Sequence, residues 1–399
     1  MPEQPVPEQP VPERVVIVGA SAAGLATAEA LREKGYGGAL TLVGAERHAP
    51  YDRPPLSKQI LTGAWEPERA ELRDEAAIGK LGAEILLGRR ATGLDVAGRT
   101  VPLDGGDRRP FDALVIATGA APRRLPGRRL AGVHVLRTLD DALALRESLL
   151  GGPRLVVVGA GFLGCEVAAA ARRMGVDVTL VDPLPVPMLR QFGDRIGSLV
   201  GRLHRDHGAE LRTGVGVSRF AESAGRVTAV ELADGSVLDA DAVVVAVGAA
   251  PATGWLAGSG LPLGDGVECD ARCRAAPGIY AAGDVASWRN PRFGVRMRVE
   301  HRQNATEQGR AVAAGILGER RPFAPAPYFW TDQYDARIQA YGIFPPDAVP
   351  AVVSGDVAGR KFVASYSRGG RVVGVLGWNS PRELIRQRQA VLPAAPGPG

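Results

Sequence analysis

Two stretches of the chain share one order of apolar and polar positions. Each begins with a short apolar run, at 14–18 and at 154–158, and continues into a turn rich in glycine. After the first turn, residues 22–34 predict a helix and residues 39–43 a second apolar strand, and residues 153–182 repeat this order. Because a buried strand, a turn and a helix follow one another twice, the pattern predicts two βαβ units with parallel strands.

Both glycine turns have the spacing of a dinucleotide-binding fingerprint. Such a turn aims the N–H groups at the start of a helix at a pyrophosphate. Two copies in one chain predict two bound dinucleotides, for which a flavin and a nicotinamide are the natural pair. Ser21 stands where the usual pattern has its middle glycine, and its small side chain would still let a pyrophosphate approach. The candidate contacts are Gly19, Ser21, Ala22, Ala23 and Gly24 in the first turn and Gly159, Gly161, Phe162, Leu163 and Gly164 in the second.

An acidic residue follows the second strand of each βαβ unit. Glu46 and Asp182 are placed where a carboxylate accepts hydrogen bonds from a ribose. The charge of Asp182 would repel a 2′-phosphate, so we expect NADH to be preferred over NADPH. Arg190, close by in the sequence, leaves the alternative open, because it could accommodate that phosphate.

Further strand patterns place these units in a larger fold. Residues 112–119 and 241–248 are apolar runs that end in glycine, and residues 278–285 close on Gly283 and Asp284. The repeats predict an α/β fold with two Rossmann-like dinucleotide-binding domains, one inserted in the other. The expected boundaries are 14–111 with 241–320 for the first domain and 112–240 for the inserted domain, whose start is open between 112 and 150.

The C-terminal part of the chain has a different pattern. A helix is predicted from 304 to 317, and the proline-rich residues 321–327 are typical of a linker. Beyond it, alternating positions predict strands in a small α+β domain over 321–392. We expect the tails at 1–13 and 393–399 to be disordered. The predicted strands of this domain lie at 338–343, 351–353, 361–367 and 371–376.

Composition narrows the function classes. The 399 residues are 45% hydrophobic, yet no apolar run reaches the roughly 18 residues that span a bilayer, so no membrane segment is expected. The net charge of +5 comes almost entirely from arginines spread along the chain, without a nucleic-acid-binding motif. An N-terminus without an apolar signal region and a sparse, odd set of cysteines predict a cytoplasmic protein without a disulfide framework. These cysteines are Cys165, Cys269 and Cys273.

Neither a metal site nor thiol-based redox chemistry is expected. His204 and His207 have helical spacing, but no further ligands cluster with them, so a solvated helix face is predicted and no metal site. No Cys-x-x-Cys motif occurs, and residues 48–51 lack a cysteine, which argues against thiol-based redox chemistry.

Several motifs together resemble a known family. They are the PYDRPPLSK sequence at 50–58, Gly283 with Asp284, VEHRQNA at 299–305 and YFWTDQ at 328–333. From about residue 14 to about residue 384, the chain resembles the putidaredoxin reductase-like family of NADH-dependent, FAD-containing ferredoxin reductases, which serve cytochrome P450s and Rieske oxygenases. The resemblance implies that the first domain binds FAD, the inserted domain binds NAD, and the C-terminal domain covers the flavin and shapes the ferredoxin-docking surface.

The resemblance also implies residue roles. Lys58, one of only four lysines in an arginine-rich chain, would stabilise negative charge on the reduced flavin, and Glu166 would face the flavin and pair with Lys58. Asp284 would bind the ribityl chain, and Arg137 a flavin phosphate. Trp330 would cap the ring, stand between flavin and partner, or simply pack at a domain junction. The other expected cofactor contacts are Arg53, Ala91, Thr118, Gly119, Gly248, Glu300, His301 and Arg302, the last at a position where many relatives have tryptophan.

The expected activity is transfer of a hydride from NADH to FAD and of single electrons to a ferredoxin. The partner would be a small acidic iron–sulfur protein that binds transiently to a monomer, and its acidic patch would meet arginines 292, 296, 298 and 302. One alternative is an NADH-dependent reductase of a small acceptor, such as a quinone or dehydroascorbate, or of rubredoxin. Another is a signalling flavoprotein that binds DNA or protein in its reduced state.

Overall fold

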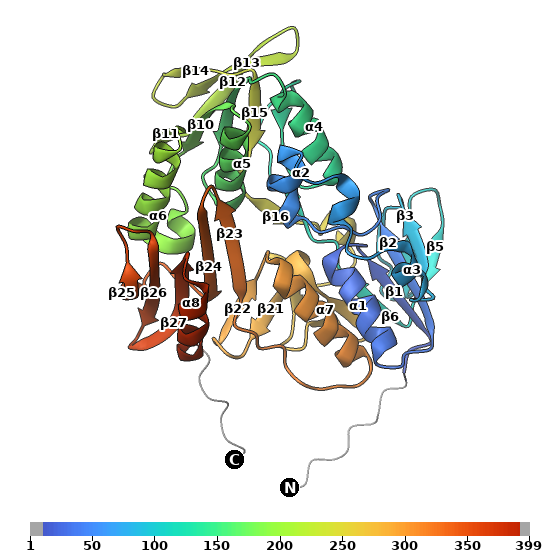
Figure 1. Cartoon of the computed structure of the whole chain (residues 1–399). Helices are drawn as coiled ribbons and strands as arrows, with labels where there is room; N and C mark the ends of the chain where they lie inside the picture. Colours follow the sequence, from blue (N-terminus) through green and yellow to red (C-terminus); the bar gives the residue numbers. More distant parts are fainter. Residues whose placement is uncertain (1–10, 392–399) are drawn as a thin grey trace. The chain divides into compact units, whose positions relative to one another are not determined.

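The computed structural model describes residues 11–391 (Figure 1). The chain divides into two compact units. Unit 1 comprises the described residues up to Asp52, Glu71–Ala121 and Ala250–Pro325, and unit 2 comprises Arg53–Ala70, Pro122–Ala249 and the described residues from Ala326. The tail predicted at 393–399 and most of the tail predicted at 1–13 lie outside the described residues.

Unit 1 is built on a six-stranded sheet in the order β19–β20–β6–β1–β2–β3. β1 lies between β2 and β6 and runs parallel to both, and its apolar run is buried after the first residue. Helices α1 (Ala22–Glu33) and α7 (Arg302–Ile316) lie side by side (Figure 1) because Gly309 has no side chain: a Cβ there would press on the Ala23 carbonyl oxygen. The strands are β1 (Arg14–Val18), β2 (Ala39–Gly44), β3 (Glu84–Leu87), β6 (Ala113–Ile116), β19 (Arg274–Ala276) and β20 (Ile279–Ala281).

Smaller elements complete unit 1. A four-stranded sheet contains the fully buried Trp288, whose indole N–H donates to the Phe323 carbonyl oxygen at 3.2 Å. Its strands are β17 (Leu263–Gly264), β18 (Gly266–Cys269), β21 (Ala286–Asn290) and β22 (Val295–Arg298). The remaining elements are β4 (Thr100–Pro102), β5 (Arg108–Pro110), α3 (Glu75–Gly79), η3 (Gly254–Leu256) and η4 (Gly283–Val285). β7 (Ala120–Pro122) and β16 (Ala249–Pro251) pair as a two-stranded sheet.

Unit 2 contains a second parallel sheet, in the order β11–β10–β9–β15–β8. β9 lies between β10 and β15, as β1 lies between β2 and β6 in unit 1. The strands are β8 (Val133–His134), β9 (Arg154–Val158), β10 (Asp177–Asp182), β11 (Glu210–Thr213) and β15 (Ala242–Val245). The helices are α2 (Gln59–Thr62), α4 (Leu139–Leu149), α5 (Phe162–Arg173) and α6 (Leu189–Asp206), with the short η1 (Pro54–Ser57) and η2 (Pro67–Ala70).

Two antiparallel sheets belong to unit 2 as well. One consists of β12 (Val217–Ser223), β13 (Arg226–Leu232) and β14 (Val237–Asp239). The other has the order β23–β24–β27–β26–β25 and is followed by α8 (Pro381–Gln387) and η5 (Arg388–Ala390). Its strands are β23 (Tyr328–Gln333), β24 (Ala336–Gly342), β25 (Val349–Asp356), β26 (Lys361–Arg368) and β27 (Arg371–Trp378).

The α/β fold class is confirmed, but one strand differs from the predicted domain boundaries. β6 pairs with β1 in the unit 1 sheet, and it lies within residues 112–150, where the start of the inserted domain was left open. β15 pairs with β9 in the unit 2 sheet, although 241 onward was assigned to the first domain. Both are short apolar runs that end in a glycine turn, and this local pattern is the same whichever sheet receives the strand.

The sequence missed β23, which adds a strand before those predicted in the C-terminal domain. Helix α7 begins at Arg302, two residues before its predicted start. Among the described residues 11–391, no helix is long and apolar enough to cross a membrane.

Candidate functional site

The first glycine turn leaves no room for side chains at two positions. A Cβ at Gly19 would overlap the backbone of Ala117, and a Cβ at Gly24 would overlap the Gly19 carbonyl oxygen. Gly19 also has φ of 123°, a conformation that favours glycine. Ser21 caps α1 in an extended conformation without a side-chain hydrogen bond to the helix. The start of α1, with Ala22 and Ala23, therefore keeps its N–H groups available for an anion.

A second motif of unit 1 lies against this turn. A Cβ at Gly283 would come within 3.0 Å of the Ala23 side chain, so the structure brings the two motifs together. The Gly283 N–H donates to Gln308 Oε1 at 2.9 Å, and Asp284 follows in η4. Beside them, the Thr118 hydroxyl donates to the Ala252 carbonyl oxygen at 2.9 Å.

Other predicted cofactor contacts of unit 1 have protein partners. The Tyr51 hydroxyl donates to the carboxylate of Glu46, just after β2. Gly119 has φ of 70°, and Ala91 is buried in a bridge to Leu103. Burial lowers the pKa of His301 to about 4, so this imidazole is neutral at pH 7.

The four arginines predicted to meet a ferredoxin differ in their surroundings. Arg302 forms an ion pair with Asp52, and Arg298 forms ion pairs with Asp265 at 2.9 Å and Glu300 at 2.5 Å. The Arg298 side chain is only 11% exposed. Arginines 292 and 296 are exposed, although each donates to backbone carbonyl oxygens.

The second glycine turn, in unit 2, repeats the geometry of the first. Gly159 has φ of 106°, and a Cβ at Gly164 would overlap the Gly159 carbonyl oxygen. A Cβ at Gly161 would meet only the Gln191 amide nitrogen, at 3.7 Å. Gly161 therefore leaves space above the turn, whereas Gly164 is needed for packing. Phe162 and Leu163 begin α5.

The acidic residue of the second unit is held by backbone N–H groups. Asp182 Oδ2 accepts from the Ala160 N–H at 2.6 Å, and Oδ1 accepts from the Leu184 N–H at 2.8 Å. The carboxylate is thereby fixed at the end of β10, next to the glycine turn. Arg190 is exposed on the first turn of α6, and Gly248 has φ of 95° and accepts the Arg123 N–H at 2.9 Å.

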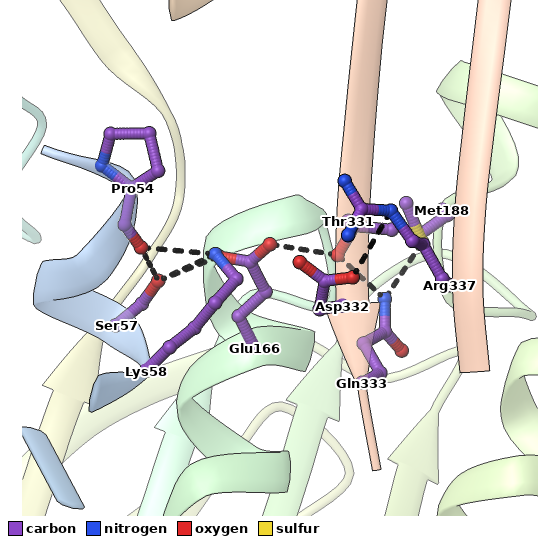
Figure 2. A network of polar contacts seen from close by, with 9 residues as sticks. All are labelled: Pro54, Ser57, Lys58, Glu166, Met188, Thr331, Asp332, Gln333 and Arg337. Carbon is purple, nitrogen blue, oxygen red and sulfur yellow. Dashed lines mark hydrogen bonds and ion pairs between the residues drawn. The ribbon is translucent and has the colours of Figure 1, made fainter. Parts of the chain in front are cut away.

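The predicted pair of Lys58 and Glu166 is present in unit 2. Lys58 Nζ lies 2.6 Å from Glu166 Oε2, and the two side chains are 12% and 9% exposed. Figure 2 shows two more donors on this carboxylate: the Ser57 hydroxyl at 2.6 Å from Oε2 and the Thr331 hydroxyl at 2.9 Å from Oε1. Lys58 also donates to the Pro54 carbonyl oxygen at 3.1 Å. A buried charge pair survives because its remaining donors and acceptors are satisfied in this way.

Sequence reasoning missed Ser57 and Thr331 as partners of Glu166. Ser57 lies beside Lys58 in a motif that carried the family resemblance, and this proximity was the only signal for it. Thr331 lies in the YFWTDQ motif at 328–333, which also carried the resemblance, but nothing in the sequence pairs it with Glu166. It reaches Glu166 because it lies on β23.

The remaining predicted residues of unit 2 lie on the elements around this pair. Arg53 donates to the Arg137 carbonyl oxygen at 2.5 Å, so these two predicted residues are in contact. Trp330 is half-buried on β23 and stacks on Tyr328 with ring centroids 5.9 Å apart.

The prediction of a solvated face was wrong for His204. Its side chain is fully buried on α6, with Nε2 at 3.1 Å from Gln333 Oε1 and Nδ1 at 3.2 Å from the Tyr334 hydroxyl. Helical spacing does not reveal that the hairpin of β23 and β24 supplies polar partners for a buried imidazole. Among residues 11–391, no group of three or more His, Cys, Asp or Glu side chains could hold a metal.

The three cysteines are buried and free. Burial raises the pKa of each thiol, that of Cys273 to about 12, so none is a reactive thiolate at pH 7.

Comparisons with known proteins cover nearly the whole chain. Residues 13–309 match the pyridine nucleotide-disulphide oxidoreductase family, and residues 328–395 match the reductase C-terminal family. The probable ferredoxin reductase CtmF of Castellaniella defragrans is 37% identical over 383 residues, which cover 95% of this chain and 93% of that protein. Among solved structures, the ferredoxin reductase for the CYP199A2 system from Rhodopseudomonas palustris matches with a TM-score of 0.91 at 36% identity, covering 94% of this chain and 93% of that one. The covalent putidaredoxin reductase–putidaredoxin complex matches with a TM-score of 0.91 at 34% identity, covering 95% and 93%.

Proposed function

Because the chain belongs to the pyridine nucleotide-disulphide oxidoreductase family, and to the ferredoxin reductases within it, we propose that it carries electrons from NADH through FAD to an iron–sulfur ferredoxin. One observation carries the proposal: the likeness to ferredoxin reductases includes both dinucleotide-binding folds and the C-terminal domain. The ferredoxin would in turn serve a cytochrome P450 or a Rieske oxygenase, since several relatives are named as reductase components of dioxygenase systems.

The residues of unit 1 fit FAD. Its glycine turn forms a cradle that side chains would fill, and the start of α1 has no side-chain cap. We assign the pyrophosphate to Gly19 through Gly24, the adenosine ribose to Glu46 and the ribityl chain to Asp284. FAD supplies the conversion of a two-electron donor into single-electron steps. The other proposed contacts in this unit are Ala91, Thr118, Gly119, Gly283, Glu300, His301 and Arg302.

The residues of unit 2 fit NADH. Its glycine turn has the same cradle, with open space at Gly161, and Asp182 is fixed beside it. A carboxylate at that position accepts hydrogen bonds from a 2′-hydroxyl and repels a 2′-phosphate, so NADH is favoured over NADPH. Lys58 and Glu166 are proposed to serve hydride transfer, with the lysine stabilising negative charge on the reduced flavin. Arg53, Arg137, Arg190, Trp330 and Gly248 remain proposed cofactor contacts.

The test is anaerobic stopped-flow reduction of the purified holoprotein by NADH and, separately, by NADPH. Fast bleaching of the flavin with NADH and slow bleaching with NADPH are expected. A [2Fe-2S] ferredoxin is then added with cytochrome c as the final acceptor, and cytochrome c reduction should depend on the ferredoxin. Fast bleaching without ferredoxin-dependent turnover would contradict the partner assignment and favour a small acceptor such as a quinone.

A further inference from the structure

A line of buried side chains continues from Glu166 into the interior of unit 2. Behind Thr331, Gln333 Nε2 lies 3.2 Å from the threonine hydroxyl. Gln333 Oε1 lies 3.1 Å from His204 Nε2, and His204 Nδ1 lies 3.2 Å from the Tyr334 hydroxyl. Thr331, Gln333 and His204 are fully buried. Figure 2 shows this line from Glu166 to Gln333, between α5 and β23.

The charge of Glu166 fixes the direction of every hydrogen bond in the line. A carboxylate only accepts, so the Thr331 hydroxyl donates to Glu166. Its oxygen then accepts from the Gln333 amide N–H, which leaves the Gln333 carbonyl to accept from His204 Nε2–H. His204 Nδ1 therefore carries no hydrogen, and the Tyr334 hydroxyl donates to it. All donors point towards Glu166.

His204 and Tyr334, at the end of the line away from Glu166, have the protonation states that this direction requires. Burial lowers the pKa of His204 to about 4 and raises that of Tyr334, so at pH 7 the imidazole is neutral and the phenol keeps its proton. Tyr334 has φ of 52°, a strained conformation for a bulky residue, and it persists where surrounding contacts hold it. Here the contacts are the hydrogen bond to His204, a hydrogen bond that Arg173 donates to the Tyr334 carbonyl oxygen, and stacking on the His207 ring, with centroids 3.9 Å apart.

We propose that Thr331 is a positioning residue for hydride transfer, and that Gln333, His204 and Tyr334 lock its hydroxyl onto Glu166. The line fixes one carboxylate oxygen and leaves the other to Lys58 and Ser57. It orients the carboxylate and is no proton path, because a neutral amide such as Gln333 does not readily pass a proton on. The inference rests on the proposed function, in which Lys58 and Glu166 serve the reaction.

The first experiment tests the direction of the line and does not depend on turnover. Histidine-selective ¹⁵N NMR of the holoprotein resolves tautomers, and the chain has only five histidines. We expect His204 to be the neutral Nε2–H tautomer at pH 7, with its signal assigned by its loss in His204→Gln. An Nδ1–H tautomer would reverse the line, because Gln333 would then have to present its N–H₂ to His204, and would overturn the proposal.

The second experiment compares three variants on β23. Thr331→Val removes the hydroxyl but keeps the shape, Thr331→Ser restores the hydroxyl, and Asp332→Asn is the matched control. Asp332 lies on the opposite face of the strand, where it pairs with Arg337 at 3.8 Å. Thr331→Val loses one hydrogen bond to a charged group, so we expect flavin reduction at saturating NADH to slow about tenfold in this variant. The Kd for NADH should stay within about twofold of the wild-type value.

The outcomes separate this inference from the proposed function. Thr331→Ser should regain most of the rate, and Asp332→Asn should match the wild type. A wild-type rate in folded Thr331→Val, or a serine variant as slow as the valine variant, would overturn the positioning role. If wild-type protein bound flavin but NADH failed to reduce it, the proposed function itself would fail, while the NMR result would still report the direction of the line.

Discussion

The ammonium group of Lys58 has three N–H donors, and all three are used within unit 2. They reach Glu166 at 2.6 Å, the Pro54 carbonyl oxygen at 3.1 Å and the Ser57 hydroxyl at 3.4 Å. The bond to Ser57 is the longest and hence the weakest, so it is the one that a bound group can replace at the least cost. An arginine would present a planar fork and could not reproduce this arrangement. The choice of lysine in an arginine-rich chain thus has a geometric reason.

The carboxylate of Asp182 is the second feature at this scale, and replacing it is expected to change the preference between NADH and NADPH. Asp182→Asn removes the charge that disfavours a 2′-phosphate, so the preference for NADH over NADPH should fall by on the order of tenfold. The measurement is the ratio of kcat/KM for the two nucleotides. Asp177→Asn, at the exposed start of the same strand, removes an equal charge and should leave the ratio unchanged. An equal fall in both variants would contradict the assignment.

At the scale of elements, the glycine turns and the helices after them were predictable, because turn chemistry and apolar periodicity are local properties. β23 was not, because polar side chains occupy buried positions on it. Thr331 and Gln333 face the interior, so the strand lacks the apolar alternation that identifies its neighbours. For the same reason His204 was misread: its burial depends on the hairpin that β23 forms. The Lys58–Glu166 pair was expected only through the family resemblance.

The second glycine turn separates packing from ligand binding. Gly164→Ala forces a Cβ onto the Gly159 carbonyl oxygen, so the melting temperature should fall by several degrees. Gly161→Ala meets nothing closer than 3.7 Å, so stability should be kept while the KM for NADH rises. Calorimetry and steady-state kinetics on the two variants check this. Destabilisation of the Gly161 variant to the same extent would show that the open space has a structural role.

The packing of α6 predicts a dependence of stability on pH. The pKa of His204 is about 4 in the folded protein, below the ordinary value of 6.5. Between these values the unfolded chain takes up a proton that the folded protein does not. The contribution of His204 to the free energy of unfolding is therefore fully present above about pH 6.5 and is lost as the pH falls towards 4. Between pH 7 and pH 5 this loss amounts to about 2 kcal/mol.

Urea unfolding at pH 7 and pH 5 measures this effect. His204→Gln removes the titrating group, so the free energy of unfolding of this variant should fall by about 2 kcal/mol less than that of the wild type between pH 7 and pH 5. His207→Gln, at the C-cap of the same helix and only half-buried, is the control and should follow the wild type. If both variants followed the wild type, the folded protein would not be holding His204 neutral.

At the scale of the whole molecule, a net charge of +5 decides little about docking, because ion pairs within the protein neutralise many of its arginines. Arg298 lies between two carboxylates and Arg302 beside one, so their charge is largely cancelled where they lie. The sequence shows how many arginines there are but not all of their partners, since Asp265 and Asp52 come from segments distant in the chain. Replacing Arg298 is therefore expected to affect folding more than docking.

Of the four predicted arginines, 292 and 296 are the exposed ones, so we expect them to attract the acidic ferredoxin that we propose as the partner. Replacing both with glutamine should raise the KM for ferredoxin severalfold at low salt and weaken its dependence on ionic strength, because a steering charge acts through a screened field. Ferredoxin-dependent cytochrome c reduction across a salt series measures both quantities, while flavin reduction by NADH should be unchanged. Arg90→Gln combined with Arg320→Gln removes the same charge from exposed arginines in other segments of unit 1 and is the control. Identical salt slopes in the two double variants would mean that net charge, and not this pair, governs the encounter.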